Sequence, residues 1–135
     1  MAAKYQIKDG EQFRTNRCVV DTATVIAPGD LVALSSGVII KAVAASTAVA
    51  FCPAGSATGE VICDVSVGNN FTLTGTADAN FAVTDKGILC DILDTTQVID
   101  IGTSSTDVLK VGMAEESGTV SAKTSIEVRI NKPLF

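Results

Sequence analysis

The sequence predicts an all-β fold, a small antiparallel β-sandwich or barrel of short strands. Three observations support this class. Short apolar runs recur along the chain, turn-forming residues separate them every 8–12 residues or so, and one run alternates cleanly between apolar and polar side chains. The 135 residues show no break in composition, so we expect one β-domain over residues 18–135, preceded by an extended N-terminal arm over residues 1–17.

The clearest strand is SIEVRI at residues 125–130, where Ile126, Val128 and Ile130 share one face and Glu127 and Arg129 the other. The stretch DLVALSSGVII predicts a hairpin whose short loop contains Gly37. Its two apolar runs are less regular, which indicates burial on both faces. Including these, strands are expected at residues 17–20, 31–34, 38–43, 48–52, 59–67, 70–74, 88–93, 97–101, 108–113 and 125–130.

The composition is apolar and poor in charge. Apolar residues make up 47% of the chain, and charged residues make up 19% against about 25% in ordinary soluble domains. A domain of this kind is expected to cover part of its surface with other subunits, the alternative being a monomer with an alanine-rich surface. The longest apolar stretch, residues 38–52, is too short to span a membrane and contains Lys41, so no membrane association is expected.

The net charge of −5 is unevenly distributed. Residues 1–17 carry four cations against Asp9 and Glu11, a net charge of +2, so the total of −5 leaves −7 on the rest. An acidic body argues against nucleic-acid binding, which needs a basic face. The basic leading segment is instead a candidate contact for an acidic partner, although solvated terminal residues would look the same. The four cations are Lys4, Lys8, Arg14 and Arg17.

Residue types that carry catalysis or bind metal are sparse. The chain has no His, which excludes Ser–His and Cys–His nucleophile pairs. The four cysteines show no C-x-x-C spacing, so we expect buried, reduced thiols and no zinc site. Asp91, Asp94 and Asp100 lack the spacing of an EF-hand loop, which leaves calcium binding open. No cofactor and no enzymatic activity are expected. The cysteines are Cys18, Cys52, Cys63 and Cys90.

Four segments together resemble the small all-β decoration (cement) proteins of tailed bacteriophage heads, of the lambda-like type. They are VIAPGDLVAL–SSG–VIIKA, GEVICDVSVG, VTDKGILCDILDTTQVIDIG and VLKVGMAEESGTVSAKTSIEVRINKPLF. The resemblance is one of pattern and covers most of the chain from Val19 onward. It implies a structural virion protein that binds the outer surface of the head and stabilises the capsid by bridging major capsid subunits. It also implies a homotrimer, with a dimer as the alternative, on the capsid surface after synthesis in the host cytoplasm.

The arm is the expected capsid contact, because family members often use extended N-terminal arms. The arm here lacks the prolines of the lambda-like members, and deleting residues 1–17 is expected to leave the fold intact while weakening shell binding. Two alternatives remain open: another phage structural β-protein such as a tail-tube component, and, less favoured, a small carrier or binding barrel. A carrier barrel needs a modifiable lysine on a tight turn, whereas Lys41 lies within an expected strand and Lys86 lacks the neighbouring Met residues. The expected contact residues are Lys4, Tyr5, Lys8, Phe13, Arg14 and Arg17.

Overall fold

The computed structural model describes residues 5–10, 14–21, 24–56, 61–79, 81–94, 96–114 and 125–135. Over these ranges the chain forms β-strands and one 3-10 turn, η1, with no α-helix, which confirms the all-β class. No helix capable of crossing a membrane occurs in the same ranges. The elements are β1 Gln6–Gly10, β2 Arg14–Val19, β3 Asp30–Ser35, β4 Val38–Lys41, β5 Ala50–Cys52, β6 Ile62–Val67, β7 Phe71–Thr76, η1 Val83–Asp85, β8 Leu89–Ile92, β9 Ile99–Asp100, β10 Leu109–Ala114 and β11 Ser125–Ile130.

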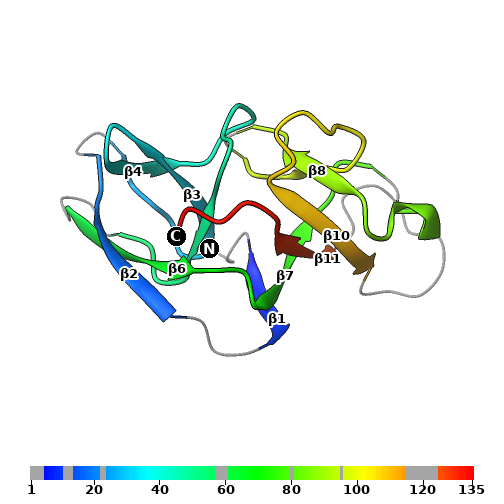
Figure 1. The fold of residues 1–135 in the computed structure, drawn as a ribbon, viewed down its shortest axis with the longest axis horizontal. Helices are drawn as coiled ribbons and strands as arrows, with labels where there is room; N and C mark the ends of the chain where they lie inside the picture. Colours follow the sequence, from blue (N-terminus) through cyan, green and yellow to red (C-terminus); the bar gives the residue numbers. More distant parts are fainter. Residues whose placement is uncertain are drawn as a thin grey trace.

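The strands form three antiparallel sheets arranged in two lobes (Figure 1). One lobe holds most of a six-stranded sheet in the order β1-β7-β11-β10-β8-β9. The other lobe holds a three-stranded sheet in the order β4-β3-β5 and the two-stranded ribbon β2-β6. The tail after β11 runs from the first lobe back to the second, where Leu134 donates its N–H to the carbonyl of Val49 at 3.0 Å.

The alternating run at residues 125–130 forms β11 as predicted. Ile126, Val128 and Ile130 are buried, while Arg129 is exposed and Glu127 is partly exposed. Apolar side chains on every second residue can all reach the core only in an extended strand. The sheet therefore has one apolar face toward the core and one polar face.

The predicted hairpin is β3–β4, closed by Ser36 and Gly37 with φ of 51° and 85°. Positive φ at both loop residues matches the turn that suits the twist of paired strands. The burial of β3 on both faces is confirmed, since Leu31 belongs to the main core of the six-stranded lobe and Val32 to a second core in the other lobe. β3 is therefore a wall shared by the two cores.

The N-terminal segment is extended, as predicted, but its described residues belong to the sheets. β1 pairs with β7, β2 pairs with β6, and Tyr5 is 1% exposed within the main core. Gly75 makes room for this ring, because a Cβ there would lie 2.5 Å from Tyr5 Cε1. The described residues of the expected arm are therefore paired with strands of the β-domain. The burial of Tyr5 also argues against the expectation that residues 1–17 are dispensable for folding.

Candidate interaction surface

Two of the predicted contact residues, Arg14 and Arg17, lie in the ribbon that β2 forms with β6. β2 pairs with β6 along its full length, from Arg14 opposite Val67 to Val19 opposite Ile62. Within the described ranges no strand pairs with the other edge of β2, whose end is joined to β4 by the single bridge Val20–Ile39. β2 lies at the outer margin of its lobe in Figure 1. The ribbon thus presents an open strand edge.

The two faces of the ribbon have different environments. Cys18 and Cys63 lie opposite each other and pack toward the second core. On the outer face, Arg17 Nε lies 3.5 Å from Asp64 Oδ1, with the two side chains 73% and 47% exposed. An ion pair this exposed is screened by water and contributes little to stability, so both charges remain available to a partner.

Aliphatic side chains adjoin this ion pair. Val19 is 53% exposed and lies directly opposite Ile62, which is 44% exposed. Val61, 50% exposed, is held beside them because its carbonyl accepts the N–H of Val20 at 2.8 Å. Exposed aliphatic groups rimmed by charges are typical of protein–protein contacts. We call Arg17, Val19, Val61, Ile62 and Asp64 the ribbon face; Arg14 lies on the opposite face of β2, on the side of Cys18.

A hollow of about 370 Å³ borders the ribbon face. Arg17, Ile62, Cys63 and Asp64 line it from the ribbon, and the turn at Ala54 and Gly55 lines it from the opposite side. The turn packs tightly, because a Cβ on Gly55, whose φ is 68°, would lie 2.5 Å from the carbonyl oxygen of Ile26. The ribbon face therefore combines an open strand edge, exposed aliphatic groups and a recess.

The predicted contact residues have different positions. Arg14 and Arg17 are exposed on β2, whereas Tyr5 is a core residue whose hydroxyl donates to the carbonyl of Gln97 at 2.9 Å. Burial raises the pKa of Tyr5. Tyr5 is therefore corrected from a contact residue to a structural one. Lys8 lies in β1, and Lys4 and Phe13 lie outside the described residues.

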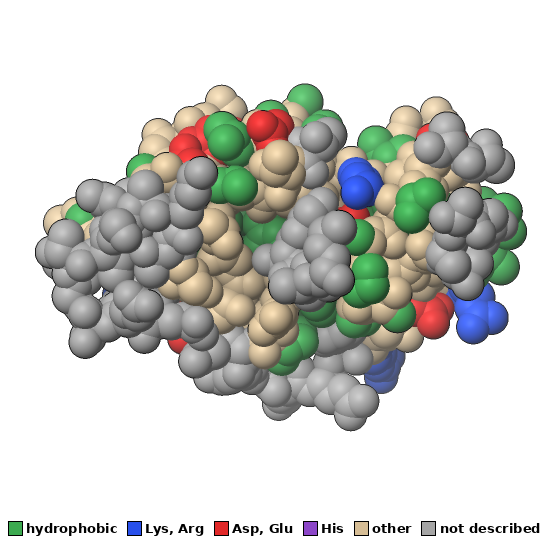
Figure 2. All heavy atoms as spheres, turned by 180° about the vertical axis from the view of Figure 1, so that it is seen from behind, with side chains coloured by type: hydrophobic (Ala, Val, Ile, Leu, Met, Phe, Trp, Pro, Cys, Tyr) green, Lys and Arg blue, Asp and Glu red, His purple; other side chains and the backbone are tan. Residues whose placement is uncertain are grey.

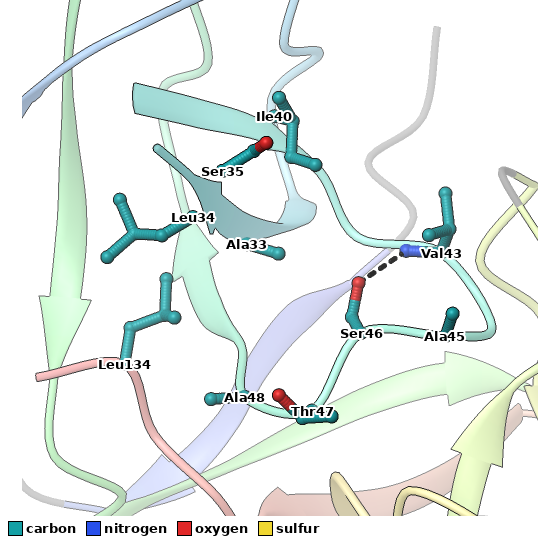
Figure 3. A pocket seen from close by; sticks show the side chains of 10 residues that line it. All are labelled: Ala33, Leu34, Ser35, Ile40, Val43, Ala45, Ser46, Thr47, Ala48 and Leu134. Atoms are coloured by element: carbon teal, nitrogen blue, oxygen red, sulfur yellow. Dashed lines mark hydrogen bonds between the residues drawn. The ribbon is translucent and has the colours of Figure 1, made fainter. Parts of the chain in front are cut away.

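The surface on β3–β4 carries a different hollow, of about 420 Å³ (Figure 3). Small apolar and hydroxyl side chains line it, and Ser46 Oγ accepts the N–H of Val43 at 2.9 Å to close the adjoining loop. A hollow without a charged or titratable side chain has no group suited to acid–base chemistry. Its lining residues are Ala33, Leu34, Ser35, Ile40, Val43, Ala45, Ser46, Thr47, Ala48 and Leu134.

Asp91, one of the three candidate calcium ligands, is used by the backbone. Its Oδ1 accepts the N–H groups of Ser105, Thr106 and Asp107 at 2.9–3.0 Å. Burial alone would raise the pKa of Asp91, but these hydrogen bonds outweigh it and lower the pKa below its usual value. Among the described residues no group of three or more His, Cys, Asp or Glu side chains is arranged to hold a metal ion.

The four cysteines are free thiols. Cys52, Cys63 and Cys90 are buried, and Cys18 is partly exposed. Burial, reinforced for Cys63 by the neighbouring Cys52 and for Cys90 by Asp91, raises the pKa of each of these two thiols to about 12. Thiols held in the protonated form are poor nucleophiles, which fits the predicted role of small core residues.

Lys41, considered above as a modifiable lysine, lies at the end of β4. Its Nζ is 3.3 Å from Oδ2 of Asp30, a carboxylate that is fully buried. Asp30 Oδ2 also accepts the N–H of Ala27 at 2.9 Å, which closes the Pro28–Gly29 turn. Lys41 therefore serves as the counter-charge of a buried carboxylate in the hairpin.

Comparison with known proteins found no match, whether to a family model, a curated protein or a solved structure. The functional assignment therefore rests on the chain's own residues and on the pattern resemblance given above. Of the surfaces described above, the ribbon face has the most features suited to contact with another protein. Of the predicted contact residues Arg17 belongs to the ribbon face and Arg14 to the other face of β2, whereas Val19, Val61 and Ile62 were not predicted as contact residues. In the sequence, Val19, Val61 and Ile62 stand in short apolar stretches that look the same as those of buried strands.

Proposed function

We propose that the chain is a structural virion protein that binds the outer surface of a tailed-bacteriophage head and stabilises it by bridging major capsid subunits. The observation that carries the proposal is the ribbon face, where the open edge of β2 adjoins exposed Val19 and Arg17. The pattern resemblance to head decoration proteins supports the same role. Such a role needs contact surfaces and a rigid domain, and no turnover.

The open edge of β2 supplies a defined way to bind. An extended segment of a capsid subunit can add to this edge as a further strand, with main-chain hydrogen bonds giving affinity. Val19 would give an apolar contact beside that strand, and Arg14 and Arg17 would attract an acidic partner. Seen from behind in Figure 2, the visible Lys and Arg side chains lie over the lobe that contains the ribbon.

Self-association into a trimer completes the proposal. Three copies related by cyclic symmetry present three ribbon faces at once, so weak individual contacts combine into tight overall binding. Sedimentation equilibrium of the purified protein should give a mass three times the chain's 13.8 kDa. Rings or stacked tubes in electron micrographs would instead indicate a tail-tube component.

The test of the proposal is co-sedimentation with expanded empty heads of the virus that encodes the chain. Val19→Asp places a carboxylate on the ribbon face and should lower occupancy on heads about tenfold or more, since a desolvated charge without a partner is costly at an interface. Leu93→Asp is the matched control, because Leu93 is 40% exposed on the other lobe. It should bind like the wild type.

Two results would count against the ribbon face. One is equal occupancy of wild-type protein, Val19→Asp and Leu93→Asp on the heads. The other is an equal loss in both variants while thermal unfolding shows both to be folded. Absence of any wild-type binding to the heads would contradict the decoration role itself.

A further inference from the structure

A groove on the polar face of the six-stranded sheet has features that the proposed capsid contact does not use. Its volume is about 340 Å³, and it lies over β10 and β11 with the turn before β8 at one side. It belongs to the lobe that does not contain the ribbon face. Its lining residues are Thr72, Lys86, Gly87, Lys110, Val111, Gly112, Glu127, Val128 and Arg129.

The groove concentrates positive charge. Lys110 and Arg129 are both exposed and lie directly opposite each other across β10 and β11. Like charges in this position destabilise a sheet, so the pair is not explained by folding. In the described part of the chain the ion pairs are Arg17–Asp64 and Lys41–Asp30, neither of which involves a groove residue.

A third cation, Lys86, is held at the side of the groove by the turn that carries it. Gly87, whose φ is 86°, donates its N–H to the carbonyl of Val111 at 2.7 Å. The N–H of Val111 in turn donates to the carbonyl of Ile88 at 2.9 Å. These two hydrogen bonds dock the turn onto β10. Three cations from three separate segments thus surround one groove, on backbone that is in place before any ligand arrives.

The groove also has an open floor. Gly112 lies beside Glu127, and a Cβ on Gly112 would come within 3.3 Å of the Glu127 Cβ and carbonyl oxygen. The absence of that side chain leaves sheet backbone at the base of the groove. Glu127 is the one acidic residue in the lining, so the groove carries a net charge of +2 from Lys86, Lys110, Arg129 and Glu127 in a chain of −5.

We propose that this groove binds an extended, carboxylate-rich peptide segment of a protein partner. Separate carboxylates can pair with Lys110 and with the planar fork of Arg129, while the peptide backbone passes over Gly112. A nucleic acid fits less well, because its continuous phosphates would meet Glu127 and the acidic remainder of the chain. The inference rests on the groove alone and is independent of the capsid role.

The test is a titration of isotope-labelled full-length protein with a blocked hexaglutamate peptide at low salt, followed by amide NMR. The largest shifts should occur at Gly87, Lys110 and Gly112, and added salt should reduce the affinity. The double variant Lys110→Gln/Arg129→Gln should weaken binding about fivefold or more. Arg14→Gln/Arg17→Gln removes the same charge from β2, on the other lobe, and should leave binding unchanged.

A second variant tests the shape of the groove at constant charge. Gly112→Ala narrows the floor and should also weaken peptide binding, provided that the amide spectrum shows the native fold. If the Lys110→Gln/Arg129→Gln and Arg14→Gln/Arg17→Gln variants weaken peptide binding equally, net charge alone explains the binding and the proposal is overturned. An absence of shifts at the groove, or stronger binding of inorganic phosphate or single-stranded DNA than of the peptide, would also overturn it.

Discussion

The side chain of Gln97 pairs with the backbone of Leu31 as a neighbouring strand would. Its Oε1 accepts the Leu31 N–H at 2.8 Å, and its Nε2 donates to the Leu31 carbonyl at 2.6 Å. Nε2 also donates to the carbonyl of Ala42 at 3.2 Å. Because Leu31 lies in β3, the wall between the two cores, Gln97 ties the β8–β9 connection to the hairpin of the other lobe.

Removing this side chain should destabilise the whole domain. Gln97→Ala leaves the Leu31 N–H and the Ala42 carbonyl buried without these partners, and each orphaned group costs about 1–3 kcal/mol. The Leu31 carbonyl keeps the N–H of Ala42 at 3.0 Å. We expect the free energy of unfolding in urea to fall by about 3 kcal/mol. Gln6→Ala, at an exposed position in β1, should change it by less than about 0.5 kcal/mol. Similar small effects of both variants would show that the pairing does not stabilise the fold.

Tyr5 should be required for stability although it lies near the start of the chain. Tyr5→Phe removes the hydroxyl that donates to Gln97 and should lower the free energy of unfolding by about 1 kcal/mol. Tyr5→Ala also empties the space beside Gly75 and should lower it by about 3 kcal/mol or more. Deletion of residues 1–17 should be at least as damaging. A truncated protein with the wild-type melting temperature would contradict this placement.

Acid should loosen the loop that Asp91 holds. The folded pKa of Asp91 lies below its unfolded value of about 3.9, so its stabilising contribution is present above pH 4 and is lost as the pH falls through the folded pKa. Asp91→Asn should therefore be less stable than the wild type at pH 6, and the difference should shrink toward pH 2. Urea unfolding at both pH values measures it. A difference independent of pH would exclude the ionised carboxylate as its cause.

Thiol labelling should follow burial. Cys18 is the one partly exposed cysteine of the four, so maleimide at pH 7.5 should modify it first in native protein. Cys90 is fully buried with a raised pKa and should react only after unfolding. Mass spectrometry of partly labelled protein gives the order. Rapid labelling of Cys90 in Cys18→Ser protein would show that the main core opens readily.

The sequence predicts strands correctly where a single local pattern is sufficient to identify them. Alternation placed β11 at residues 125–130, and Ser-Ser-Gly placed the β3–β4 hairpin. The packing of Tyr5 was not readable, because a single aromatic residue in a polar stretch has no periodicity to reveal its partner. Gln97 was also missed, since its positive φ of 62° and its contacts to Leu31 arise only in the folded chain.

The candidate surface was only partly readable for a related reason. Arg14 and Arg17 stood out as charges on a basic segment, but the sequence does not show that β2 keeps one edge open. Nor does it show that Val19 points outward, because an apolar letter at a strand position normally indicates burial. Lys110 and Arg129 are 19 residues apart in the chain and meet only through the register of β10 and β11.

Electron cryomicroscopy of expanded heads mixed with the purified protein is the decisive test of the proposed capsid contact. Additional density is expected on the outside of the shell, and the two-lobed domain should fit into it with the open edge of β2 against a major capsid subunit. Heads that remain bare at saturating protein, or density confined to the tail, would contradict it.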